Sequence, residues 1–288
     1  MEKSCSVVIP SYNEEKAIGE VISKINNILE NSKIQHEIIV VDDGSTDRTS
    51  EIAGERGAKV IKLKENKGVG FARKVGIKNA QYEHIVMIDA DGTYPCEKIP
   101  EMLEFLPEYD MVIGARKKES GTLPFLRKPV KWFIKKIAEY IVRKKIPDLN
   151  SGLRAFKKSI SLQYFNILPD THSWVSTITI AFLNDNYDVK YIPIDYFKRK
   201  GKSTFHPFKD TFTYLLLVIR TILYFRPLKI FFPTGFFILL IGILRTLYNA
   251  KFLHDVKESD VMIVMTGVFI LVVGFLADMI VKIQKKQI

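Results

Sequence analysis

Two acidic clusters in the sequence have the residue types and the spacing to do chemistry. Residues 40–47 read VVDDGSTD, and residues 87–92 read MIDADG. Carboxylates that follow a buried apolar strand stand at the carboxyl edge of a sheet, where α/β proteins bind ligands. An Asp-x-Asp pair can supply hard oxygen ligands to Mg²⁺ or Mn²⁺ while a bound diphosphate supplies others. The alternatives are an ordinary exposed turn and, in the first cluster, a helix N-cap by Ser45 or Asp47.

These clusters need a sheet to position them, and the sequence predicts one. Runs rich in Val and Ile predict strands at residues 6–10, 37–41, 58–63, 84–88 and 111–114. Helical spacing of apolar residues over 18–29, together with the segments 46–56 and 70–80, predicts helices between them. This alternation is typical of an α/β fold with a doubly wound, mostly parallel sheet.

Composition limits the class of protein. The 288 residues are 47% hydrophobic and 26% charged, which excludes collagen-like and disordered chains. Cys5 and Cys96 are too few for a disulfide framework or a thiolate metal site, so reducing cytosolic conditions are expected. Residues 1–10 do not resemble a secretory signal. The net charge of +11 predicts an anionic partner, which could be nucleic acid, a phosphorylated substrate or a membrane surface.

Two apolar segments near the C-terminus have the length of membrane spans. Residues 230–248 contain one charged residue, Arg245, and residues 261–280 contain only Asp278. Each is about 20 residues long, enough to cross a hydrocarbon core of about 30 Å. Two buried helices of a soluble core are the alternative. Lys and Arg are in excess outside the pair rather than in the loop 251–260, which predicts cytosolic termini and a cytosolic catalytic part.

The expected organisation therefore has three parts. Residues 1–207 form a cytosolic α/β domain, and residues 227–288 form a two-helix anchor in the cell or endoplasmic reticulum membrane. Between them, the apolar and aromatic segment 208–226 predicts an amphipathic helix at the membrane interface. A helix packed on the soluble domain is the alternative for this segment. The spans could also associate into a homo-oligomer.

Basic residues are concentrated in two segments of the α/β part. Residues 115–145 hold eleven Lys and Arg against two Glu, and residues 198–202 add four more. Such segments are attracted to anionic lipid, and guanidinium groups among them can bind phosphate bidentately. Nucleic-acid binding would explain the charge but not the spans, and stacking aromatics interleaved with the basic residues are not evident. We therefore expect no nucleic acid as a partner.

Five motifs occur in the order typical of the family 2 inverting glycosyltransferases, which the chain resembles. They are SVVIPSYNE at 6–14, VDDGSTD at 41–47, NKGVGFAR at 66–73, DAD at 89–91 and SGLR at 151–154. The resemblance is greatest to polyprenyl-phosphate sugar synthases of the dolichyl-phosphate mannosyltransferase and glucosyltransferase group. It implies a GT-A-type fold, and the two spans match group members that carry a small membrane anchor.

The resemblance also implies roles for individual residues. The nucleotide-sugar side comprises Pro10, Tyr12, Glu14, Val41, Asp43, Lys67, Gly68, Asp89, Ala90 and Asp91. Mg²⁺ or Mn²⁺ is held by Asp89 and Asp91, with Thr93 as a weak or water-mediated ligand where mannosyl-type relatives have Gln. The residues implied in catalysis and phosphate binding are Asp91, Arg116, Arg127, Ser151, Arg154 and Arg199, with Lys198 as the substitute for Arg199.

The expected reaction moves a sugar from a UDP- or GDP-sugar to a polyprenyl-phosphate lipid, with inversion. A phosphate monoester is already largely dianionic at pH 7, so the site needs cations more than a general base. Asp148 and Ser151 could orient Arg154 or the acceptor phosphate, and His172 is not assigned a catalytic role. One alternative is a family 2 enzyme acting on a glycan or another lipid hydroxyl. Another is a non-catalytic membrane protein that binds nucleotide sugars.

Overall fold

The structure is a computed structural model that describes residues 4–117, 135–140, 142–171, 173–197, 223–224 and 226–286. The chain divides into two compact units, residues 1–214 and 215–288. The predicted domain boundary at residue 207 lies outside the described residues, as does nearly all of the predicted interfacial helix at 208–226. Both therefore stay predictions.

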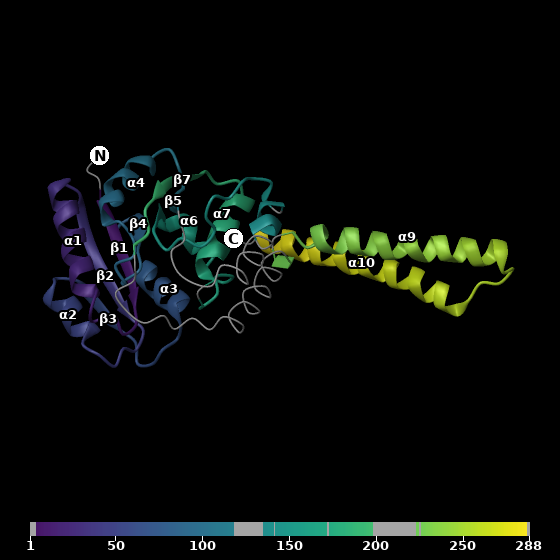
Figure 1. The fold of residues 1–288 in the computed structure, drawn as a ribbon, viewed down its shortest axis with the longest axis horizontal. Coiled ribbons are helices and arrows are strands. Elements are labelled where there is room, and N and C mark those ends of the chain that lie inside the picture. Colours follow the sequence, from purple (N-terminus) through teal and green to yellow (C-terminus); the bar gives the residue numbers. More distant parts are fainter. Residues whose placement is uncertain are drawn as a thin grey trace. The chain divides into compact units, whose positions relative to one another are not determined.

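The first unit is built on a seven-stranded sheet of order β3-β2-β1-β4-β6-β5-β7 (Figure 1). The strands are β1 (Ser4–Ser11), β2 (Gln35–Asp42), β3 (Lys59–Lys62), β4 (His84–Met87), β5 (Met111–Arg116), β6 (Arg154–Lys157) and β7 (Val189–Ile194). β6 runs antiparallel to its neighbours β4 and β5, whereas the other pairings are parallel. The predicted mostly parallel α/β sheet is thus confirmed, and β1 to β5 lie where the sequence predicted strands.

Helices connect these strands. They are α1 (Ile18–Asn31), α2 (Thr49–Glu55), α3 (Val69–Asn79), the 3₁₀ turn η1 (Cys96–Lys98), α4 (Ile99–Phe105), α6 (Lys158–Leu162) and α7 (Trp174–Asn184). In α1 the buried residues follow helical spacing, so one apolar face packs on the sheet. In α7 all eleven residues are buried. A helix buried on every side has no polar face, which is why its sequence lacks the period that reveals α1.

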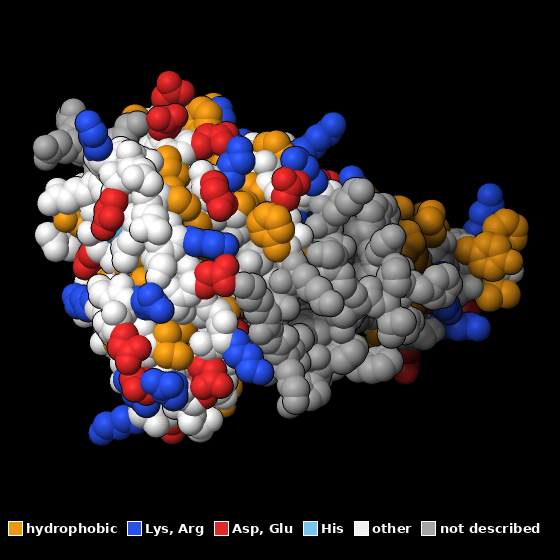
Figure 2. Space-filling model, turned by 60° about the vertical axis from the view of Figure 1, so that its left-hand side comes forward, with side chains coloured by type: hydrophobic (Ala, Val, Ile, Leu, Met, Phe, Trp, Pro, Cys, Tyr) orange, Lys and Arg blue, Asp and Glu red, His pale blue; other side chains and the backbone are white. Residues whose placement is uncertain are grey.

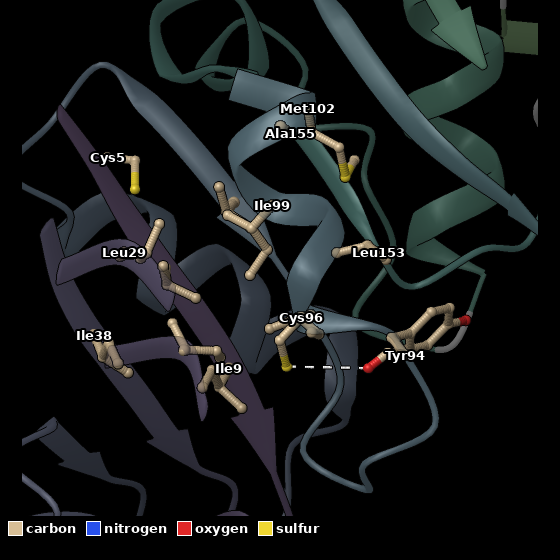
Figure 3. Close-up of a cluster of buried hydrophobic side chains, with 14 of the residues drawn as sticks. Cys5, Ile9, Leu29, Ile38, Tyr94, Cys96, Ile99, Met102, Leu153 and Ala155 are labelled. Carbon is tan, nitrogen blue, oxygen red and sulfur yellow. Dashed lines mark hydrogen bonds between the residues drawn. The ribbon is translucent and has the colours of Figure 1, made fainter. Parts of the chain in front are cut away.

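A cluster of buried hydrophobic side chains forms a core of this unit between the sheet and the helices α1 and α4 (Figure 3). Both cysteines are buried free thiols within it. Burial raises the pKa of Cys5 and of Cys96 to about 12, so both thiols stay protonated at neutral pH. Tyr94 lies at the end of the cluster, with its ring pointing away from Cys96. The core thus reaches the segment that follows the Asp-x-Asp pair.

The second unit contains two long helices, α9 (Leu228–Phe252) and α10 (Glu258–Lys286), which run antiparallel (Figure 1). Both are long and apolar enough to cross a membrane, and only 11% of the most apolar window of each is buried. The helices approach closely at glycines, since a Cβ on Gly267 would lie 2.6 Å from the backbone nitrogen of Leu239. The two predicted apolar helices are therefore confirmed, and two buried core helices do not explain their exposure.

One polar cluster joins the two helices near the loop. The fully buried carboxylate of Asp260, in the first turn of α10, accepts hydrogen bonds from Arg245 Nε at 3.2 Å and Asn249 Nδ2 at 2.5 Å. A carboxylate is also favoured at a helix N-terminus by the helix dipole. Asp260 therefore fixes how the end of α9 meets the start of α10.

Replacement of this carboxylate is expected to weaken the helix pair. Asp260→Ala should destabilise the full-length protein by about 1–2 kcal/mol, the scale of interhelical hydrogen bonds in membranes. The midpoint of SDS-induced unfolding in mixed micelles measures this. Asp255→Ala is the matched control, because Asp255 lies exposed in the connecting loop. Equal midpoints for the two variants would contradict the role given to Asp260.

Candidate active site

Most of the predicted site residues lie at one edge of the sheet. β2 ends at Asp42, β4 ends at Met87, and β5 ends at Arg116. Because β6 is antiparallel, it begins at this same edge, with Arg154 opposite Met87. The strand order turns back between β1 and β4, the kind of position where α/β sheets bind ligands. Topology thus brings the SGLR segment beside the Asp-x-Asp pair.

Asp43, the first residue after β2, is oriented by backbone groups. Its two carboxylate oxygens accept the N–H groups of Lys67 and Gly68, each at 2.8 Å. Burial raises the pKa of Asp43, and these two hydrogen bonds act in the opposite direction. The preceding Asp42 is fully buried and accepts the Ser45 N–H at 2.8 Å, so it shapes the turn. Asp43 is therefore the acid that joins this turn to the start of α3.

The turn after β1 is tied to the turn after β2. The Asn13 N–H donates to Ser45 Oγ at 2.9 Å, and Asn13 Oδ1 accepts the Thr46 N–H at 2.9 Å. The Glu14 N–H donates to Thr49 Oγ1 at 2.8 Å. Asn13 has a φ of 55°, a left-handed conformation that Asn adopts more readily than most residues. These bonds hold the predicted nucleotide-side residues of both turns in one place.

The Asp-x-Asp pair follows β4. Asp91 is nearly buried, and its Oδ1 accepts the N–H of Thr93 at 3.1 Å and the Thr93 hydroxyl at 2.6 Å. The Asp89 side chain is 32% exposed and pairs with Arg73 at 2.9 Å. No group of three or more His, Cys, Asp or Glu that could hold a metal occurs within the described ranges. Two carboxylates fit Mg²⁺ or Mn²⁺, since such ions take only one or two from the protein and the rest from phosphates and water.

The SGLR segment packs directly on this pair. The Gly152 N–H donates to the Tyr94 hydroxyl at 2.7 Å. A Cβ built on Gly152 would lie 2.2 Å from Asp89 Oδ2, so a larger residue there would displace the Asp89 carboxylate or the backbone. The Tyr94 ring contacts Tyr196 edge-on at 5.2 Å. Tyr94 was not predicted from the sequence, although it stands three residues after Asp91 in the segment where the chain departs from its mannosyl-type relatives.

Arg116, at the end of β5, forms a largely buried ion pair with Asp148. Its Nε and Nη2 donate to the two oxygens of Asp148 at 2.7 and 2.9 Å. The guanidinium also lies over the Tyr196 ring, 5.3 Å from the centroid. Burial raises the pKa of Asp148, but the hydrogen bonds and charge of Arg116 outweigh this and hold it below its usual value. Asp148 therefore orients Arg116, whereas the sequence suggested Arg154 or the acceptor phosphate as its partner.

Breaking this pair should be costly. Asp148→Asn removes one charge of this largely buried pair, so we expect a loss of up to about 3 kcal/mol in unfolding free energy. Because the folded pKa of Asp148 is lowered, its contribution is fully present above the unfolded value of about 3.9 and is lost as pH falls through the folded value. Urea unfolding of both proteins from pH 7 to 3 tests this. A difference that grew on acidification would contradict the pairing.

Arg154 is fully buried. Its Nη1 donates to the Val175 carbonyl at 2.9 Å and to Thr179 Oγ1 at 3.1 Å, and its Nη2 donates to the Ser151 carbonyl. Burial, followed by the charge of Arg73, lowers the pKa of Arg154 to about 10, so the group is charged at neutral pH. Its Nε and Ser151 Oγ are buried and lack partners among the described residues. A phosphate would have to reach these buried atoms for the predicted contact to form.

The remaining predicted residues are distributed as follows. Pro10 and Val41 are register partners in β1 and β2, Tyr12 is exposed, and Ala90 is buried. The residues outside the described part of the chain are Arg127, His172, Lys198 and Arg199, with most of the basic segment 115–145. On the face of the molecule in Figure 2, described basic and acidic side chains are interspersed. Arg73, to which the sequence analysis assigned no role, pairs with Asp89, and its guanidinium lies over the ring of Trp174.

Family models match both parts of the chain. The model described as Glycosyl transferase family 2 matches residues 6–165. The chain belongs to glycosyl transferase family 2. A second model, the GtrB C-terminal hairpin, matches residues 226–283 of this family 2 protein and thus covers α9 and most of α10. The resemblance seen in the five motifs is confirmed.

Individual relatives agree with this assignment. The family 2 chain is 32% identical over 205 residues to the "Dolichyl-phosphate hexose transferase" of Haloferax volcanii, covering 70% of this chain and 87% of the relative. It is 36% identical over 169 residues to the "Dolichol-phosphate mannosyltransferase" of Pyrococcus furiosus, covering 54% of this chain and 46% of that protein.

A solved structure supports the fold. The glucosyl-3-phosphoglycerate synthase of Mycobacterium tuberculosis, crystallised with Mn²⁺ and UDP-Glc, superposes with a TM-score of 0.60 at 21% identity. The match covers 77% of the family 2 chain and 78% of that structure. At this identity the likeness shows the fold alone, and the expected GT-A-type architecture is confirmed at that level.

Proposed function

We propose that this glycosyltransferase moves a sugar from a nucleotide sugar to a polyprenyl-phosphate lipid at a membrane. The observation that carries the proposal is that Asp43, Asp89, Asp91 and Arg116 converge on one sheet edge in a chain that also carries a GtrB-type hairpin. The dolichyl-phosphate transferases among its relatives support the acceptor class.

The donor would lie across the carboxyl ends of β1, β2 and β4. The tied turns around Asn13 and Asp43 offer hydrogen-bond acceptors to the base and ribose. Asp89 and Asp91, with Thr93, would hold Mg²⁺ or Mn²⁺ against the diphosphate. The bound cation would stabilise the negative charge of the leaving group as a Lewis acid.

The proposed acceptor would require cations in the site more than a general base. A phosphate monoester has a second pKa of about 6 and is mostly dianionic at pH 7, so no general base is needed. Its oxygen attacks the anomeric carbon, the bond from that carbon to the diphosphate oxygen breaks, and the nucleoside diphosphate leaves with the electron pair, inverting the configuration. Repulsion between the acceptor phosphate and the donor diphosphate opposes the attack. Arg116, with the predicted Arg127, Arg154 and Arg199, would offset this repulsion.

The helix pair would keep the enzyme at its lipid substrate. The excess of Lys and Arg at the terminal ends of α9 and α10 supports cytosolic termini and a cytosolic catalytic domain. The lipid phosphate would then be reached from the cytosolic face. Association of the hairpins into a homo-oligomer stays a prediction.

A donor screen tests the proposal. Purified full-length protein is incubated with polyprenyl phosphate, Mn²⁺ or Mg²⁺, and radiolabelled UDP- and GDP-sugars. We expect one donor to give a labelled lipid that mild acid hydrolyses, as a glycosyl phosphate should. Label transfer to glycan hydroxyls, with no lipid product from any donor, would favour the alternative acceptor class.

A further inference from the structure

Arg73, on the second turn of α3, contacts the first carboxylate of the Asp-x-Asp pair. Its side chain is 5% exposed, and its Nη2 lies 2.9 Å from Asp89 Oδ1. The guanidinium lies over the ring of the fully buried Trp174, 5.7 Å from the centroid. Its Nε and Nη1 are buried and meet no hydrogen-bond partner in the described part of the chain. The carboxylate of Asp89 is thus the anion that this buried cation contacts.

Asp89 is held from two sides. Arg73 binds Oδ1, while the backbone of Gly152 lies against Oδ2 so closely that a Cβ there would be 2.2 Å away. Gly152 is fixed in turn by its hydrogen bond to Tyr94. Groups behind a metal ligand that fix its orientation commonly change metal affinity or activity by 10- to 100-fold when they are mutated. The orientation of Asp89 therefore depends on residues that need not touch the substrate.

The position of Arg73 depends on how α3 begins. The N–H groups of Gly70 and Phe71 donate to the Asp170 carbonyl at 2.9 and 3.3 Å. A Cβ on Gly70 would lie 2.2 Å from the Pro169 carbonyl oxygen, so the first turn of α3 rests directly on backbone. Lys74 also pairs with Asp170. The same segment leads into Trp174, so α3 and the aromatic support of Arg73 are fixed to each other.

We propose that Arg73 is a positioning residue that holds Asp89 in the orientation required by the metal-bound diphosphate, with Trp174 as its support. The inference rests on the proposed metal role of Asp89. Arg73 acts through Asp89, which explains why a charged residue of α3 is buried beside an acidic ligand rather than exposed. Lys78, exposed near the end of the same helix, serves as a comparison.

Nucleotide-induced thermal stabilisation of the full-length protein tests the role without turnover. The probe is UDP or GDP, whichever stabilises the wild type, added alone and with Mn²⁺. In Arg73→Gln the shift from nucleotide alone should persist, because the Asp43 turn is untouched, while the extra shift from Mn²⁺ should fall by more than half. The turnover number should fall roughly 100-fold with little change in the KM for lipid. Arg73→Lys should recover part of both, and Lys78→Gln, at an exposed position of the same helix, should match the wild type.

Variants of Trp174 test the same role of Arg73 if Arg73→Gln does not fold. Trp174→Phe keeps a ring beneath the guanidinium and should retain most of the Mn²⁺-dependent shift, whereas Trp174→Leu should lose it. A full Mn²⁺ shift and normal turnover in Arg73→Gln would overturn the inference while leaving the proposed function standing. A larger Mn²⁺ shift would also overturn it, because Arg73 would then compete with the metal. Absence of any Mn²⁺ shift in the wild type would overturn both proposals.

Discussion

Asp91→Ala should lower the turnover number roughly a thousandfold and leave the protein folded. Asp91 is nearly buried at the carboxyl end of β4, and its carboxylate is oriented by two hydrogen bonds from Thr93. In the proposed reaction, loss of this carboxylate would weaken binding of the cation and so remove charge stabilisation of the leaving diphosphate. Steady-state transfer of labelled sugar to polyprenyl phosphate measures the effect.

The control for this variant is Glu55→Ala, which removes an exposed carboxylate at the last residue of α2. Circular dichroism and the unfolding temperature should show that both variants fold. If Asp91→Ala turned over at the rate of Glu55→Ala, the Asp-x-Asp pair would have no role in catalysis.

The second large effect is expected at Gly152, which carries no functional group. Gly152→Ala would place a methyl group 2.2 Å from Asp89 Oδ2, so the carboxylate or the backbone must move. A displacement of about 1 Å in a catalytic group can cost 10²-fold in rate, and we expect a loss of that order. The fall should appear in the turnover number, together with weaker binding of Mn²⁺ in the presence of nucleotide.

Gly54→Ala is the matched control, because a Cβ there meets only a Val60 methyl group at 4.0 Å and the residue lies inside α2. Alanine favours a helix more than glycine does, so this variant should be as stable as the wild type or slightly more so. Equal activity of the two alanine variants would show that Asp89 tolerates displacement and plays no part in orienting the donor.

The strands and helices that the sequence revealed are those with a strong local pattern. β1 and β2 contain the apolar runs 7–10 and 38–41, each followed by a polar residue, and α1 shows helical spacing of buried residues. The acidic edge could be predicted from such runs, because a carboxylate that directly follows a buried strand lies at the carboxyl edge of a parallel sheet. The shared edge of Asp43, Asp89 and Asp91 follows from this reasoning.

The elements and contacts that orient the site residues could not be predicted in this way. β6 is only four residues long, and α7 is buried on every side, so neither has a period to detect. The contacts that orient the site join residues far apart in the chain, such as Tyr94 with Gly152 and Arg116 with Asp148. Each depends on the antiparallel insertion of β6 between β4 and β5, which no local sequence pattern predicts.

The proposed reaction depends above all on the acceptor being a phosphate. The most direct measurement compares one polyprenyl chain ending in a phosphate with the same chain ending in a hydroxyl, using the full-length protein, Mn²⁺ and the donor found in the screen. We expect label transfer to the phosphate only, at a rate that changes little above the acceptor's second pKa of about 6, because no general base is required. Comparable transfer to the alcohol would contradict a polyprenyl-phosphate transferase and identify a hydroxyl as the natural acceptor group.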